Sequence, residues 1–396
     1  MHRKAGKSEQ EGMPCYSDNR FCFEIFKRES GTDLSQIRLG YPPFKLDLSL
    51  TERCNLRCLH CSYYLSDKIP EVDMPTELLE AIAKYVLPHI HYLRITGFNG
   101  EPMSYPHFDD FMKELVDRDI DVQITTNGTL IDKDRAKLIS DVCSSIDISI
   151  EGVGASYTRI RGYKWENIKK KIEMLSNARD ASSTLKIVLD VTLLYENLND
   201  YESLFETTKN LGIDGIRLRH YYPVLHSQVS QSLLYNMRES NEFFDRMKEL
   251  SLIYGVPLDL PPYFPLQSLS TDLHELTKHI ERMDCAIPWE GLAITPRGDI
   301  RVCCSGFVMG KHKASDKTLM HVWNNRAYRR LRQVINGPMA PLPCRKCSMM
   351  CRDLTDLVFP LQFYGAEIVN LRRFLAQRFP FARRVYRHIH RPPKGR

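Results

Sequence analysis

The chain has 396 residues, of which 43% are apolar and 26% charged, with a formal net charge of +6. This length exceeds one ordinary domain, and the composition is that of a globular protein. No apolar run approaches the roughly 20 residues that a membrane-spanning helix needs. The first residues, MHRKAGKSEQEGMP, lack the apolar core of a secretory signal, so we expect a cytoplasmic protein.

The positive charge is concentrated at the C-terminal end. Residues 371–396 contain eight Arg, one Lys and no acidic residue, so they contribute +9 and the rest of the chain −3. Apolar side chains at helical spacing interrupt these arginines. Such a segment either docks on the acidic body of the same chain, lies peripherally on an anionic membrane surface, or binds a peptide partner. We do not expect it to bind nucleic acid.

From residue 45 onward, strand patterns alternate with helix patterns. Apolar residues at period two predict strands at 45–50, 92–98, 121–127, 145–150, 185–194 and 215–222. Helical periodicity follows these strands at 75–86, 107–118, 132–143, 165–180, 199–211 and 230–253. The alternation predicts an α/β fold, a parallel (β/α)6 partial TIM barrel with right-handed crossovers. In such sheets the chemistry lies at the carboxyl ends of the strands.

Composition divides the chain into five segments. We assign an N-terminal extension to 1–44, the partial barrel to 45–255, a Pro-rich linker to 256–284, a small Cys-rich α+β domain to 285–355 and the basic tail to 356–396. The twelve cysteines follow this division, because nine of them lie in three groups within the barrel and the Cys-rich domain. Grouped thiols in a reducing compartment favour metal binding over disulfides.

The first group lies in LTERCNLRCLHCSYYL, directly after the first predicted strand. Cys54, Cys58 and Cys61 have the spacing C-x3-C-x2-C. A structural zinc site needs four ligands, whereas three thiolates suit three corners of an iron–sulfur cluster and leave one iron open. The alternative is a zinc loop completed by a distant ligand or by His60, although the neighbouring Cys61 crowds that histidine.

This spacing, placed after the first strand of a (β/α)6 pattern, resembles the radical S-adenosylmethionine (SAM) superfamily. The resemblance implies that the three cysteines hold a 4Fe-4S cluster and that SAM chelates its open iron. His60 occupies the position where family members usually have an aromatic residue before the third cysteine.

Further motifs end the next strands as they do in that family. GFNGEP resembles the family's G-G-E-P, with Asn99 replacing a glycine, and SIEG resembles S-x-D-G, with Glu151 in the place of an Asp that faces the ribose. Arg159 and Arg161 are both candidates for the SAM carboxylate, and Asn197 matches an Asn near the adenosine. The resemblance thus implies a SAM site made of His60, Gly100, Glu101, Pro102, Thr126, Asn127, Ser149, Glu151, Arg159, Arg161 and Asn197.

The second cysteine region fits a second metal centre. Cys303 follows a predicted hairpin, and PCRKCSMMC supplies a C-x2-C pair that directs two thiolates to one metal. Iron–sulfur and zinc both fit these spacings. C-x12-G-x4-C before C-x2-C resembles the SPASM/twitch extension of radical SAM enzymes. That resemblance implies one auxiliary 4Fe-4S cluster held by Cys285, Cys303, Cys344 and Cys347, with Cys351 as an alternative ligand and Cys304 as a bystander.

The resemblance implies a function. Such enzymes cleave SAM reductively to a 5′-deoxyadenosyl radical, which abstracts hydrogen from a substrate C–H bond, and a fully ligated auxiliary cluster suits electron transfer. An external one-electron reductant such as flavodoxin or ferredoxin is implied. We expect a radical SAM oxidoreductase-type enzyme acting on a sugar, an aminocyclitol or another natural-product intermediate. The alternatives are a maturase of a ribosomally synthesised peptide and a non-enzymatic iron–sulfur redox relay or sensor.

Overall fold

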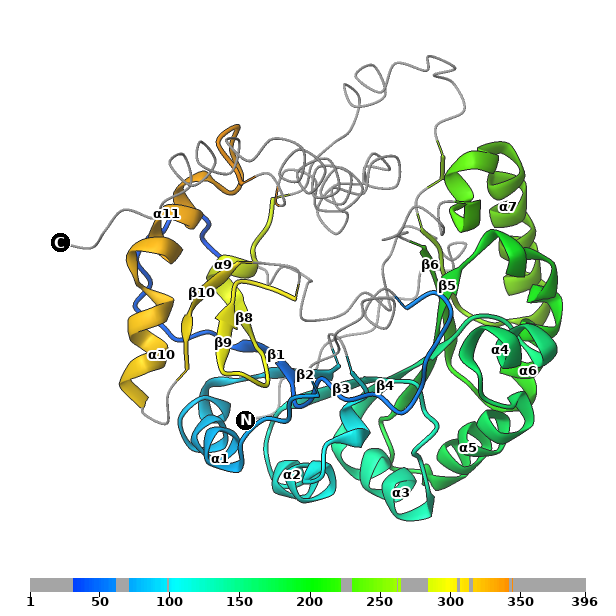
Figure 1. Ribbon diagram of the computed structural model, residues 1–396, viewed down its shortest axis with the longest axis horizontal. Helices are drawn as coiled ribbons and strands as arrows, with labels where there is room; N and C mark the ends of the chain where they lie inside the picture. The colour runs from blue at the N-terminus through cyan, green and yellow to red at the C-terminus, as the bar shows by residue number, and fades with distance from the viewer. Residues whose placement is uncertain are drawn as a thin grey trace, which may run out of the picture.

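A single curved sheet organises the protein (Figure 1). The computed structural model describes residues 31–61, 71–97, 100–221, 230–261, 263–264, 284–304, 307–312, 316–341 and 344. Within them the strand order is β10-β9-β8-β1-β2-β3-β4-β5-β6-β7. The strands are β1 (Lys45–Ser49), β2 (Tyr92–Thr96), β3 (Asp121–Thr126), β4 (Cys143–Ile150), β5 (Lys186–Leu193), β6 (Gly215–His220), β7 (Leu258–Asp259), β8 (Gly291–Ile294), β9 (Asp299–Arg301) and β10 (Val308–Lys311).

Helices cover the outer side of the parallel part of this sheet (Figure 1). They are α1 (Thr76–Tyr85), α2 (Phe108–Leu115), α3 (Lys133–Val142), α4 (Gly154–Arg161), α5 (Trp165–Ala178), α6 (Tyr201–Asn210) and α7 (Met237–Tyr254), and the C-terminal part adds α9 (Ile287–Glu290), α10 (Asp316–Trp323) and α11 (Arg326–Val334). All six predicted strands form and pair in parallel. The predicted partial barrel is therefore confirmed. Helix α4, which lies between β4 and α5, was not predicted.

Each barrel strand separates apolar from polar side chains between the two faces of the sheet. Leu46 and Leu48 of β1 are fully buried in the main hydrophobic core, whereas the intervening Asp47 is paired with Arg94 of β2. Because successive side chains of a strand point to opposite faces, apolar residues pack under the helices and polar residues line the inner face. This alternation places charged groups inside the barrel, below the strand ends where the cysteine loop lies.

The C-terminal Cys-rich part is continuous with the barrel sheet. Strand β8 pairs in parallel with β1, from Lys45 opposite Gly291 to Leu48 opposite Ile294, and β9 and β10 extend the sheet as antiparallel strands. A Cβ atom at Gly291 would lie 2.8 Å from the Cβ of Lys45, so this close pairing requires glycine. The Nζ atom of Lys45 also lies 3.2 Å from a carboxylate oxygen of Glu290, and both side chains are buried.

The segment before β1 packs against the C-terminal part. Residues 31–44 pass beside α10 and α11 in Figure 1. The amide of Asn324 donates to the Leu39 carbonyl at 2.9 Å and accepts from the Leu39 N–H at 2.9 Å, as a neighbouring strand would. Trp323 donates its indole N–H to the Tyr41 carbonyl at 3.0 Å. The described part of the predicted N-terminal extension is thus an anchored strap, which its polar sequence does not indicate.

Several sequence expectations fall near or outside the described residues. Strand β7 lies within the range 256–284 that the sequence assigns to a linker, and it pairs in parallel with β6. Most of the remaining linker and all of the basic tail 356–396 lie outside the described residues. No helix within the described ranges is both long and apolar enough to cross a membrane.

Candidate functional site

The cysteine loop lies at the carboxyl end of β1. Cys58 is buried, Cys54 and Cys61 are partly exposed, and none of the three forms a disulfide. The N–H of Cys61 donates to the Cys58 carbonyl at 3.1 Å, which closes a turn between these two ligands. The guanidinium of Arg57 donates to the carbonyls of Cys54 at 2.7 Å and Leu56 at 2.9 Å, so it braces the loop from outside.

The thiols of this loop are compatible with an iron–sulfur cluster. No three His, Cys, Asp or Glu side chains of the described residues converge on one point, as a zinc ion would require. A cubane binds each thiolate at a different iron, so its ligands do not need to converge. The Asn127 amide nitrogen lies 3.9 Å from the Cys54 sulfur, so the end of β3 also contacts the first cysteine of the loop. The loop therefore fits a three-cysteine cluster.

The G-E-P turn after β2 packs directly against the cysteine loop. The Glu101 N–H donates to the Arg53 carbonyl at 2.6 Å. A Cβ atom at Gly100 would lie 2.6 Å from that same oxygen and 2.7 Å from the Thr51 carbonyl, so only glycine permits this approach. Pro102 then begins a short 3-10 helix, Pro102–Ser104. Phe98 and Asn99 lie outside the described residues.

The structure brings Glu101 together with the TTNG end of β3. Its buried carboxylate accepts hydrogen bonds from the Thr126 hydroxyl at 2.6 Å, the Asn127 N–H at 2.7 Å and the Met103 N–H at 3.2 Å. Burial raises the pKa of Glu101, although these hydrogen bonds oppose the shift. Glu101 therefore positions the turn and the strand end in this structure, and its contact with the SAM amine stays a prediction.

A polar bridge that sequence reasoning missed joins β3 to the cysteine loop. Asn55 accepts from the Asn127 amide at 2.9 Å and donates to the Thr129 hydroxyl at 2.8 Å. Asn55 directly follows Cys54 in the sequence. An amide side chain between two candidate metal ligands is the sequence feature that could have identified this bridge. This bridge fixes the distance between the loop and the end of β3.

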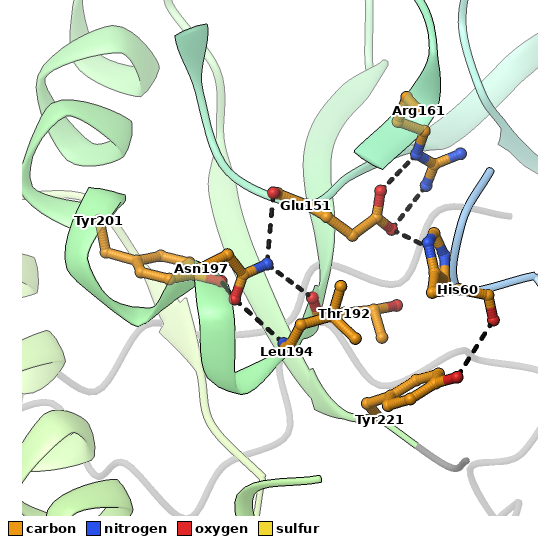
Figure 2. Close-up of polar contacts among 8 residues, drawn as sticks. All are labelled: His60, Glu151, Arg161, Thr192, Leu194, Asn197, Tyr201 and Tyr221. Atoms are coloured by element: carbon orange, nitrogen blue, oxygen red, sulfur yellow. Dashed lines mark hydrogen bonds and ion pairs between the residues drawn. The ribbon is translucent and has the colours of Figure 1, made fainter. Parts of the chain in front are cut away.

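Glu151 is the centre of a buried charged network (Figure 2). The Arg161 guanidinium contacts both of its carboxylate oxygens, at 2.7 Å for the Nη2–Oε1 pair, and His60 Nε2 lies 3.4 Å from Oε1. Burial disfavours the charged form of Arg161, but Glu151 outweighs it and keeps the pKa of Arg161 above its ordinary value. Burial lowers the pKa of His60, and the neighbouring Glu151 carboxylate opposes this shift.

This network distinguishes the two arginines that are candidates for binding the SAM carboxylate. Arg159 is exposed and pairs with Glu196 at 2.9 Å, whereas Arg161 lies inside the site. Of the two candidates, only Arg161 is near the cysteine loop's buried side. Glu151, which the resemblance places against the ribose, is bound here by Arg161 and His60. Ser149 is half-buried on the inner face of β4, and its contact with SAM stays a prediction.

Asn197 is held by its own chain (Figure 2). Its amide oxygen accepts from the Leu194 N–H at 3.0 Å and the Tyr201 hydroxyl at 2.9 Å. Its amide nitrogen donates to the carbonyls of Glu151 at 3.3 Å and Thr192 at 3.4 Å. These bonds connect the end of β5 to the end of β4. The arrangement indicates a positioning role, and an adenosine contact stays a prediction.

Tyr221 adds a side chain that the motifs did not include. It follows β6, lies edge-on to His60 with ring centroids 6.3 Å apart, and donates its hydroxyl to the His60 carbonyl at 3.4 Å. Arg217, Arg219 and Tyr221 are spaced two residues apart, so Tyr221 lies on the inner face with the two arginines. This alternation is the sequence feature that could have placed Tyr221 in the site.

The second cysteine region is described in part. Cys285 is buried in the main core, and Cys303 and Cys344 pack against it. Asn336 accepts from the Cys285 N–H at 2.8 Å and donates to its carbonyl at 3.3 Å, which fixes the backbone of this ligand candidate. Cys347 and Cys351 lie outside the described residues. The side chain of Cys304 lies beside the Asp47–Arg94 pair at the inner face of the barrel.

The inner face of the barrel is strongly charged. Asp147 of β4 accepts from Gln123 at 3.1 Å and from Arg217 at 2.9 Å through one oxygen, Oδ2. Its other oxygen is buried without a hydrogen-bond partner in the described part of the chain, as is Oδ1 of Asp47. Burial outweighs the neighbouring arginines and raises the pKa of Asp147 to about 6 and that of Asp47 to about 6.

We expect an Asp147→Asn substitution to change the pH dependence of stability. The folded-state pKa lies above the unfolded value, so the wild-type chain loses unfolding free energy as pH rises from about 4 to about 6. Asparagine does not titrate, so the variant lacks this pH-dependent decrease in unfolding free energy. The Tm difference, variant minus wild type, should therefore increase with pH in thermal unfolding of the apoprotein. Asp110→Asn, at an exposed site, is the control, and equal pH profiles for both variants would contradict the prediction.

Comparisons with known proteins match two segments of this chain to known domain families. Residues 48–208 match the radical SAM superfamily model, and residues 285–348 match the SPASM iron–sulfur cluster-binding domain. The tungsten-containing aldehyde ferredoxin oxidoreductase cofactor-modifying protein of Pyrococcus furiosus is 24% identical over 79% of this chain and 89% of its own length. Fe-coproporphyrin III synthase of Methanosarcina barkeri is 27% identical over 43% of this chain, which spans only 42% of that relative.

Solved structures show the same fold. SuiB of Streptococcus suis bound to the precursor peptide SuiA has a TM-score of 0.55 and 18% identity, covering 74% of this chain and 67% of SuiB. The enzyme anSMEcpe with bound AdoMet has a TM-score of 0.55 and 18% identity, covering 78% of this chain and 85% of its own. Neither a lone zinc loop nor a non-enzymatic redox protein accounts for both matched domains. The chain is an enzyme of the radical SAM superfamily with a SPASM domain, and its cofactors are SAM, a 4Fe-4S cluster that binds SAM, and auxiliary iron–sulfur clusters.

Proposed function

We propose that this enzyme cleaves SAM reductively and uses the resulting 5′-deoxyadenosyl radical to abstract hydrogen from a C–H bond of a small polar substrate. The proposal rests on one observation: the cysteine loop is hydrogen-bonded to the G-E-P turn and to the end of β3, and its His60 contacts Glu151 at the end of β4. Three strand ends therefore meet the three candidate cluster ligands at one edge of the sheet.

Residues of this chain have distinct tasks in the proposed reaction. Cys54, Cys58 and Cys61 would hold the cluster, which supplies the electron for SAM cleavage when bound. Glu101 and Asn127 fix the turn and strand end beside the loop. Glu151 orients Arg161 and His60 on the buried side of the loop. These internal hydrogen bonds preorganise the site, so little reorganisation is needed when SAM binds.

The auxiliary centre is proposed to relay one electron. Cys285, Cys303, Cys344 and Cys347 would supply four protein ligands, which leaves no open iron for substrate. A closed cluster suits electron transfer from a substrate radical. Loss of this electron would leave the substrate oxidised, which is why we propose an oxidoreductase-type reaction.

The inner face of the barrel supports a polar substrate. Buried oxygens of Asp47, Thr125 and Asp147 have no hydrogen-bond partner within the described residues, and all three residues face the barrel interior. Such oxygens are stabilised by ligand or water donors. A sugar, an aminocyclitol or a related natural-product intermediate would supply hydroxyl or ammonium donors. The alternative, peptide maturation, places a peptide side chain there instead.

The experiment combines cofactor analysis with a substrate comparison. Anaerobically reconstituted enzyme should contain about eight irons per chain and release 5′-deoxyadenosine with SAM and dithionite. C-deuterated amino sugars and aminocyclitols should then increase that release and transfer deuterium to 5′-deoxyadenosine. Bound zinc, or no SAM cleavage, would overturn the proposed chemistry. Deuterium transfer only from peptides would favour the maturase alternative.

A further inference from the structure

One face of α4 is turned toward the cysteine loop. The buried side chains of this helix, Tyr157, Ile160 and Arg161, lie three or four residues apart and therefore share a face. The Leu59 N–H of the loop donates to the Ile160 carbonyl at 2.9 Å, which joins the helix to the loop. Arg161 binds Glu151 from the same face. Tyr157 therefore lies on the side of α4 that borders the site.

The hydroxyl of Tyr157 is buried without a partner. The side chain is fully buried, and its ring packs edge-on against Trp165 with centroids 5.4 Å apart. The hydroxyl oxygen has no hydrogen-bond partner within the described residues. An unpaired buried hydroxyl destabilises a fold, and a phenylalanine would fill the same space without that penalty. The tyrosine therefore points to a partner from outside the described part of the chain.

The groups around this hydroxyl indicate where such a partner would lie. Burial raises the pKa of Tyr157, Arg161 lowers it, and Glu151 and Cys58 add to the rise. Burial also raises the pKa of the Cys58 thiol, to about 11, and the same Arg161 and Glu151 act on it. The phenol and the buried cysteine of the loop thus share one charged environment. Because its pKa is raised, the phenol keeps its proton and can donate a hydrogen bond.

We propose that the Tyr157 hydroxyl donates a hydrogen bond to a sulfur atom of the cluster that Cys54, Cys58 and Cys61 would hold, and that this bond raises the reduction potential of the cluster. The inference rests on the proposed assignment of the catalytic cluster to this loop. A donor stabilises the reduced cluster more than the oxidised one, because reduction adds negative charge. The Asn127 amide, 3.9 Å from the Cys54 sulfur, shows that polar groups of the barrel reach the sulfur atoms of the loop.

The first test is the reduction potential of the Tyr157→Phe variant in the absence of SAM. Phenylalanine removes only the hydroxyl, so the iron content should not change. In potentiometric titrations followed by electron paramagnetic resonance, the ratio of reduced to oxidised cluster at a given potential should fall about tenfold, which is about 59 mV for one electron. The signal that disappears when Cys54, Cys58 and Cys61 are replaced by alanine identifies this cluster. The auxiliary signal should not shift.

The second test is the stability of the apoprotein. Because the Tyr157 hydroxyl has no partner within the described residues, Tyr157→Phe should leave the Tm unchanged or raise it. Tyr105→Phe is the matched control. Tyr105 is also fully buried, but its hydroxyl donates to the Met74 carbonyl at 2.9 Å. The control should therefore lower the Tm of the apoprotein and leave the reduction potential unchanged.

The outcomes separate this inference from the proposed function. An unchanged potential in Tyr157→Phe, a shift that appears only after SAM is added, or an equal shift in Tyr105→Phe would overturn the inference, as would a lowered Tm of the Tyr157→Phe apoprotein. None of these measurements requires SAM cleavage. Failure of the wild-type enzyme to form 5′-deoxyadenosine would refute the proposed function instead, and the potential of the cluster could still be measured.

Discussion

Replacing Cys54, Cys58 and Cys61 together by alanine is expected to reduce the iron content from about eight to about four per chain and to abolish SAM cleavage. These thiols are the candidate ligands of the catalytic cluster, and no group of three other metal-binding side chains among the described residues lies at one point to replace them. The auxiliary cysteines lie in a separate segment and should keep their cluster. Iron and sulfide analysis with 5′-deoxyadenosine quantification measures both effects.

The matched control for this variant is Cys143→Ala. Cys143 is buried in the core under the sheet, and burial alone raises the pKa of its thiol far above the ordinary value. Because it is buried in the hydrophobic core and belongs to none of the three cysteine groups, we expect Cys143 to be a structural thiol and not a metal ligand. The control should retain about eight irons and SAM cleavage. If the triple variant also kept its full iron content, the assignment of the first cluster to this loop would be wrong.

Glu151→Gln is expected to destabilise the apoprotein by about 3–5 kcal/mol. The substitution keeps the shape of the side chain but leaves the buried guanidinium of Arg161 without its counter-charge. The energetic cost is the burial of an uncompensated cation. Chemical denaturation of the protein without cluster or SAM measures this role independently of any contact that Glu151 makes with the cofactor.

An exposed pair provides the comparison for Glu151. Glu196→Gln removes the partner of Arg159 at the surface, where solvent screens the charges, and should cost less than about 1 kcal/mol. A double variant, Glu151→Gln with Arg161→Met, should recover much of the lost stability because no buried charge remains. Equal losses for Glu151→Gln and Glu196→Gln would show that the buried network does not stabilise the fold.

The barrel and the clustering of its motifs at one edge of the sheet were predictable because their signals are local. Period-two and helical patterns identify strands and helices over a few residues, since backbone geometry alone determines which side chains share a face. The cysteine loop, G-E-P, TTNG and SIEG each follow a strand within a few residues. Parallel strands then bring their carboxyl ends to one edge. The sequence by itself therefore determined which segments meet.

The tertiary structure decided which atoms of those segments bind one another. Arg161, ten residues after Glu151 in the chain, reaches back to its carboxylate, and His60 approaches it from another strand end. The pairing of Lys45 with Gly291 and the strap at Leu39 join residues hundreds of positions apart. Burial creates these preferences, because a charge or amide removed from water must find a partner in space, and no local pattern specifies that partner.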